Sequence, residues 1–222
     1  MEPKSTYRRA LLFGANWTMV VPGVYLILSA VAIFAVGGFA VLSGDIPSAL
    51  ELAGKSPAVF GAVVMLDGVF HILFLISAVT LYMALRGSWP VRAALILACG
   101  FWQMIVGFTK GLSSLLMFTP IGSAYVVGDA ATRATLTAVG SGFYGLRLAL
   151  QTMDGFGILV IVIILSLLPA GSMPRSIRWL GWAITIALLS ATPSGPTFIL
   201  VIILFPVWAF LVGRWLKTQL PA

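Results

Sequence analysis

The sequence predicts an all-α, polytopic membrane helix bundle of about six transmembrane helices. Of its 222 residues 60% are hydrophobic and only 9% are charged. The mean hydropathy of +1.09 leaves too little polar surface to cover a soluble globule of this size. The apolar residues fall into stretches of about 20 or more, the length that crosses a bilayer as a helix. We therefore expect residues 1–222 to form one transmembrane helical domain with the lipid bilayer as its main solvent.

Six spans are expected between breaks rich in Pro, Gly and Ser, which interrupt helices. They lie near 17–43, 58–86, 91–118, 140–168, 177–193 and 196–216. The first follows a basic N-terminal segment, and the fourth carries several polar residues in an apolar run. The fifth is the shortest, and the break at 192–196 predicts a tight helical hairpin with the sixth. Pro22 and Pro206 are expected to kink spans one and six.

Basic residues predict the orientation, because Lys and Arg are retained on the cytoplasmic side. Nine of them fall on one side of the predicted bundle: Lys4, Arg8, Arg9, Arg86, Arg92, Arg175, Arg178, Arg214 and Lys217. Only Lys55 and Arg133 fall on the other side. We expect the N-terminus and the C-terminus to be cytoplasmic and the protein to lie in a bacterial inner membrane. The net charge of +7 is scattered at span ends, which does not indicate a nucleic-acid partner.

Two longer connections are expected on the outer side, near 44–57 and 119–139. Both are too short for a folded domain. The second is rich in Ala, Gly and Thr, and a re-entrant or interfacial segment is one interpretation of it.

Three short motifs resemble a widespread, uncharacterised family of bacterial six-helix membrane proteins known as a domain of unknown function. They are TLYMALR at 80–86, the segment from LP at 168–169 to MPRSIRWLGW at 173–182, and LFPVW at 204–208. The resemblance implies the six-helix fold and no activity.

Ionisable side chains within predicted spans are the candidates for function, because placing them at membrane depth is costly. Eight polar residues form the candidate ligand-binding site: Asp67, His71, Gln103, Lys110, Tyr144, Arg147, Gln151 and Asp154. At about 100° per residue, spans two, three and four each present one polar stripe. Counting from the span ends places most of these groups in the outer half of the membrane. If the stripes converge, they line one cavity that opens to the outside.

Span three is the candidate centre of the bundle. Gly107 and Gly111 lie on an arc next to Gln103 and Lys110, and Ser114 continues that arc of small residues. Glycines at this spacing allow a neighbouring helix to approach closely.

The same residues also permit a purely structural interpretation. The charges of Asp67, Asp154, Lys110 and Arg147 sum to zero, as in an ion-pair network that locks three helices. Snorkelling of Lys110 or Arg147 to the outer interface is a further alternative.

His71 is the only histidine and, with Asp67 one helical turn earlier, the candidate acid/base pair. A satisfied core histidine is the alternative. One histidine and Cys99, the only cysteine, do not supply a tetrahedral zinc site or a bis-histidine haem site, so no metal is predicted and the cofactor is unknown. A metal held by Asp67, His71 and Asp154, or a Schiff base on Lys110, is a minor alternative.

Three functions follow from these observations. The first is binding or transport of a small, partly anionic, amphipathic molecule, with Lys110 and Arg147 taking the anionic group. The second is an intramembrane enzyme acting on a lipid, quinone or isoprenoid. The third is an accessory or anchoring subunit of a membrane complex, and a homodimer is a further possibility for a small bundle with apolar faces.

Overall fold

The computed structural model describes residues 3–38, 40, 43–190 and 196–219, and side chains from residue 5 in the first range and 200 in the last. Its regular structure is α-helical, apart from an isolated bridge between Ala170 and Met173. The predicted break at 192–196 lies outside the described residues except for Pro196, where the last helix begins.

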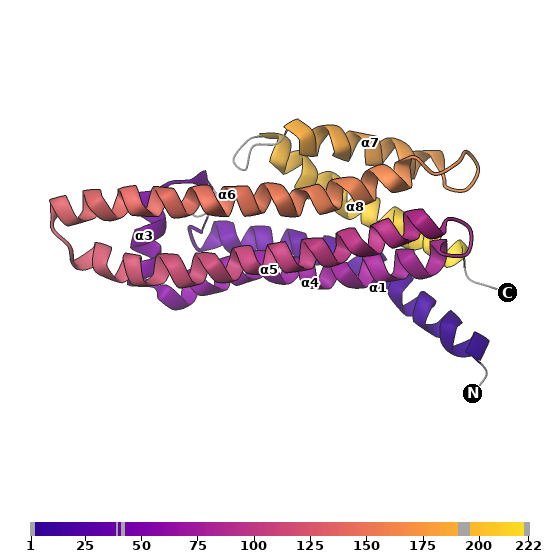
Figure 1. Cartoon of the computed structure of the whole chain (residues 1–222), viewed down its shortest axis with the longest axis horizontal. Coiled ribbons are helices and arrows are strands. Elements are labelled where there is room, and N and C mark those ends of the chain that lie inside the picture. The colour runs from indigo at the N-terminus through magenta and orange to yellow at the C-terminus, as the bar shows by residue number, and fades with distance from the viewer. Residues whose placement is uncertain (1–2, 39, 41–42, 191–195, 220–222) are drawn as a thin grey trace. The chain divides into compact units, whose positions relative to one another are not determined.

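The described residues form seven helices (Figure 1). They are α1 (Pro3–Ala35), α3 (Ile46–Lys55), α4 (Pro57–Leu85), α5 (Pro90–Val127), α6 (Ala130–Ser166), α7 (Arg175–Ser190) and α8 (Pro196–Thr218). The predicted all-α class is confirmed. Pro22 and Pro206 lie inside α1 and α8, as expected.

The main difference from the sequence prediction lies in the connections. Residues 119–127 continue α5 and residues 130–139 begin α6, so the predicted outer connection is helical over most of its length. The other connection, near 44–57, contains α3. The sequence prediction placed the span ends where the apolar stretch ends. A helix can continue past that point through residues such as Ala and Thr until a capping residue ends it.

Among the described residues, five helices are long and apolar enough to cross a membrane: α1, α4, α5, α6 and α8. Their most apolar windows have mean hydropathies of 1.7 to 2.3 and are only 22 to 44% buried. Large apolar side chains are left exposed, including Phe13 at 60% and Leu28 at 63%. Lipid suits such surfaces, whereas water does not.

The chain divides into two compact units. The first unit comprises Met1–Ile27, Phe70–Met104 and Gly155–Ala222, and the second comprises Leu28–Val69 and Ile105–Asp154. Helices α1, α4, α5 and α6 each contribute residues to both units.

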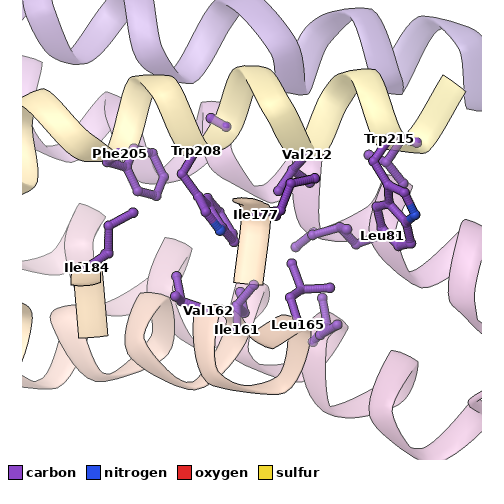
Figure 2. Packing of buried hydrophobic residues seen from close by; sticks show 14 of the residues in the cluster. Leu81, Ile161, Val162, Leu165, Ile177, Ile184, Phe205, Trp208, Val212 and Trp215 are labelled. Carbon is purple, nitrogen blue, oxygen red and sulfur yellow. The ribbon is translucent and has the colours of Figure 1, made fainter. Parts of the chain in front are cut away.

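The core of the first unit is built around α8. Phe205 and Trp208 of α8 are 1% and 2% exposed, and they pack with residues of α4, α6 and α7. Figure 2 shows Trp208 next to Ile177 of α7 and Val162 of α6. The α7 residues in this core recur at helical spacing, because one face of this helix is buried against α8.

The second unit has its own core, to which α3 contributes one face. Ile46, Ala49, Leu50 and Ala53 of α3 are buried and recur at the spacing of one helix face. The Asp45 side chain accepts a hydrogen bond from the Ser48 amide and caps the start of the helix.

A short, capped turn joins α5 to α6 in the second unit. The Asp129 carboxylate accepts a 2.8 Å hydrogen bond from the Thr132 amide at the start of α6. Hydrogen bonding from the Thr132 side chain, and then from its backbone amide, lowers the pKa of Asp129 below its ordinary value. The Arg133 side chain donates to the carbonyls of Tyr125, Val126 and Gly128, which end α5. The two caps explain why the only interruption in this helical stretch is at residues 128–129.

Candidate functional site

Four charged side chains meet in the second unit, and three helices supply them. Asp67 comes from α4, Lys110 from α5, and Arg147 and Asp154 from α6. Arg147 and Asp154 are seven residues apart, so after two helical turns they project from one face. The polar stripes predicted for spans two, three and four therefore converge at these four residues.

Lys110 lies between the two carboxylates. Its Nζ atom is 2.5 Å from Asp154 Oδ2 and 3.0 Å from Asp67 Oδ2. Arg147 reaches the same oxygen of Asp67, with Nη2 at 3.1 Å. One carboxylate oxygen is thus shared by an ammonium and a guanidinium group, and both contacts are charge-assisted.

Ser114 joins this network, although the sequence prediction treated it only as a small residue beside a packing face. It lies one turn after Lys110 on α5, and its hydroxyl donates to the Lys110 carbonyl at 2.7 Å. That hydroxyl oxygen accepts a 3.1 Å hydrogen bond from Arg147 Nη1. Arg147 Nε is buried and has no hydrogen-bond partner among the described residues. The sequence signal for this role was the position of Ser114, four residues after Lys110 and therefore on the same helix face.

Glycines bring α4 and α5 close together beside the network. A Cβ atom on Gly111 would lie 2.9 Å from the Val64 carbonyl oxygen of α4. A Cβ on Gly68 would lie 3.6 Å from the Gly107 carbonyl oxygen. The close approach predicted from Gly107 and Gly111 is present, and it lets Lys110 reach Asp67 across the helix pair.

The four charged side chains of the network differ in how far they are buried. Lys110 and Arg147 are each 2% exposed and Asp154 is 5% exposed. The side chain of Asp67 is 25% exposed. Asp67 is therefore the most exposed member of this network.

His71 and Gln103 form a separate buried pair in the first unit. Gln103 Nε2 and His71 Nδ1 are 3.1 Å apart, and the two residues are 0% and 3% exposed. Gln103 Oε1 is buried without a hydrogen-bond partner among the described residues. The contact joins span two to span three, as the stripes predicted. The pairing of His71 with Asp67 as an acid/base couple stays a prediction.

The remaining two candidates, Tyr144 and Gln151, lie on α6. The ring of Tyr144 packs against Gly44, where a Cβ atom would lie 2.8 Å from ring atom Cε1. Gln151 is half-buried, and no hydrogen bond or ion pair joins it to another described residue. Their predicted roles in ligand binding stay predictions.

The arrangement suits anion chemistry better than metal chemistry. The two cations and two carboxylates sum to zero charge, and the Lys110 ammonium lies between the carboxylates where a metal ion would otherwise be held. Among the described residues, no group of three or more His, Cys, Asp or Glu side chains could hold a metal. Two adjacent cations are a means of binding an oxyanion or a carboxylate.

The five long apolar helices among the described residues are those of an integral, multi-pass α-helical membrane protein by their length and composition. No family model, curated protein or solved structure matches the chain.

Proposed function

We propose that this protein crosses a bacterial inner membrane six times, with both termini in the cytoplasm. The span added to the five long apolar helices is α7, the fifth in chain order, whose 16 residues measure about 24 Å at 1.5 Å per residue, slightly less than a bilayer core. Its packing on α8 supports a helical hairpin, and Arg175 and Arg178 at its start support a cytoplasmic beginning.

Cysteine labelling tests this topology in a Cys99→Ala background. Ser88→Cys and Ser172→Cys are expected to resist an impermeant maleimide applied from outside, whereas Gly128→Cys is expected to react. Labelling of Ser190→Cys from outside supports α7 as a span. If Ser190→Cys reacts only after the cytoplasmic side is opened, α7 does not cross.

We propose that the charged network binds a small, partly anionic, amphipathic molecule and serves its binding or transport. The observation that carries this proposal is the sharing of Asp67 Oδ2 by Lys110 Nζ and Arg147 Nη2, at 3.0 and 3.1 Å. An anionic ligand presents the same kind of oxygen to the same two cations. Asp67 thus occupies the ligand's place, and the apolar helix surfaces nearby accept the ligand's apolar part.

Charge balance then couples the ligand to a proton. The network is neutral with Asp67 ionised, and an anion that enters alone would leave a net negative charge among buried groups. If Asp67 takes up one proton as the anion binds, its carboxyl group releases the two cations and the network stays neutral. Binding of one monovalent anion together with one proton is therefore the expected stoichiometry.

Native mass spectrometry on protein extracted mildly from its own membrane tests the binding. We expect a stoichiometric small molecule on the wild-type protein and its loss from Arg147→Gln, with Lys55→Gln as the matched control. Lys55 is exposed and pairs with Glu51 outside the network. Folding is checked by circular dichroism. Equal retention by a folded Arg147→Gln variant and by Lys55→Gln would remove the network as the site.

The neutrality of the network also favours a second function, that of an accessory or anchoring subunit. The four charges then only fasten α4, α5 and α6 to one another. This function predicts a stoichiometric protein partner and no small molecule in the same mass spectra.

A further inference from the structure

A basic pocket lies in the first unit, where the connection between α6 and α7 meets the end of α8. Its volume is about 520 Å³. The polar and aromatic side chains that line it are Ser172, Arg175, Arg178, Trp215, Thr218 and Gln219. It belongs to residues that the charged network does not use.

Hydrogen bonds hold the walls of this pocket in place. Trp215 Nε1 of α8 donates to the Ser172 carbonyl at 2.9 Å, which ties the connection to the helix. Gly171 has a φ of +93°, a conformation that glycine adopts readily, and it reverses the chain there. The Ser172 hydroxyl donates to the Pro169 carbonyl and the Thr218 hydroxyl to the Trp215 carbonyl, both at 2.7 Å. The walls of the pocket are thus held by bonds within the chain itself.

Among the residues of the first unit that the structure describes, no acidic side chain balances the positive charge of this pocket. Arg175 is exposed and Arg178 is half-buried. The described residues of the first unit include no Asp and no Glu. The first turn of α7 lies at the same place, and its helix dipole adds to the attraction for an anion.

The donors that remain define the chemistry of the occupant. The hydroxyls of Ser172 and Thr218 already donate to carbonyls, so the two guanidinium groups are the principal donors. Guanidinium groups bind phosphate oxygens in a two-pronged manner. Met173 and Trp215 supply apolar wall beside them.

We propose that this pocket binds the phosphate group of an anionic phospholipid. Its volume is large enough for a lipid headgroup. Its arginines are among the residues expected at the cytoplasmic surface of the membrane, where anionic lipids are attracted to basic pockets. The proposal requires the membrane location but not the ligand of the charged network.

Lipid retention by the full chain in nonionic detergent tests this site. Native mass spectrometry is used to titrate dioleoyl phosphatidylglycerol against dioleoyl phosphatidylcholine. We expect preferential retention of phosphatidylglycerol, and a loss of about tenfold in Arg178→Gln, the factor for one charge-assisted hydrogen bond. Arg214→Gln is the matched control, because Arg214 is exposed on α8 and does not line the pocket.

Each result decides the proposal. Equal retention of phosphatidylglycerol by Arg178→Gln and Arg214→Gln overturns it. Loss of the lipid preference in millimolar inorganic phosphate overturns the lipid as the source and leaves a free phosphate site. If circular dichroism shows that Arg178→Gln does not fold, Arg175→Gln carries the same comparison, because that arginine is exposed and its replacement removes no buried contact.

Discussion

Replacing Lys110 with Met should destabilise the protein far more than the loss of two hydrogen bonds would. Lys110 is 2% exposed and lies 2.5 and 3.0 Å from two carboxylates. Hydrogen bonds between membrane helices average about 0.6 kcal/mol each, or about 1.2 kcal/mol for two. Removing one partner of a buried ion pair costs about 3–5 kcal/mol, because a charge is left uncompensated. We expect the larger figure, since Lys110→Met leaves two carboxylates and one guanidinium group.

A second substitution separates charge balance from the loss of contacts. Lys110→Met/Asp154→Asn restores neutrality and keeps the ion pair between Asp67 and Arg147. The double variant should therefore recover about 2 kcal/mol of the stability lost in the single variant. Reversible unfolding in mixed micelles of SDS and nonionic detergent, followed by circular dichroism, measures both free energies.

The exposed lysine of α3 supplies the control for this series. Lys55 is paired with Glu51, and their side chains are 64% and 52% exposed. Lys55→Met should leave the free energy of unfolding unchanged within error, because water screens an exposed pair. A loss below about 1 kcal/mol in Lys110→Met, with no recovery in the double variant, would refute the reasoning from buried charge.

Three further predictions concern packing and pH. Gly122→Ala should destabilise the second unit, because its Cβ would lie 2.7 Å from backbone atoms of α3. Gly142→Ala should instead stabilise α6 by about 0.5–1 kcal/mol in the same unfolding assay, because nothing lies within 4 Å of its added Cβ. Trp208→Ala should cost about 3–5 kcal/mol in that assay, because a side chain only 2% exposed leaves a cavity. The pKa of Asp129 is lowered from 3.8, so its cap stabilises α6 above the ordinary pKa and is lost as the pH falls through the lower, folded-state pKa. Hydrogen exchange at the Thr132 amide, corrected for intrinsic rates, should show this loss of protection on acidification and show none in Asp129→Ala.

Composition was sufficient to predict the class of fold, because few charges and long apolar runs admit only membrane helices. It could not place helix ends outside the membrane, where apolar length carries no information. The signals were nevertheless present in the sequence. Asp45 precedes buried residues at helical spacing in α3, and Asp129 is three residues before Thr132 at the start of α6.

The candidate site shows a similar limit. Helix periodicity placed Lys110 and Arg147 on polar faces, and the structure brings them together with Asp67 and Asp154. Periodicity fixes the angle of a side chain on its own helix, but not the rotation of one helix against the next. The role of Ser114, whose hydroxyl accepts from Arg147, depends on that rotation and was therefore missed.

Replacing Asp67 with Asn tests whether Asp67 competes with the ligand for Lys110 and Arg147. The variant leaves two cations and one carboxylate in the network, so the anion no longer needs to displace a charge. Occupancy by the retained small molecule is read by native mass spectrometry, with circular dichroism as the check of folding. If Asp67 competes with the ligand, occupancy is higher in Asp67→Asn than in the wild-type protein. Equal or lower occupancy in a folded Asp67→Asn variant would show that Asp67 does not compete with the ligand.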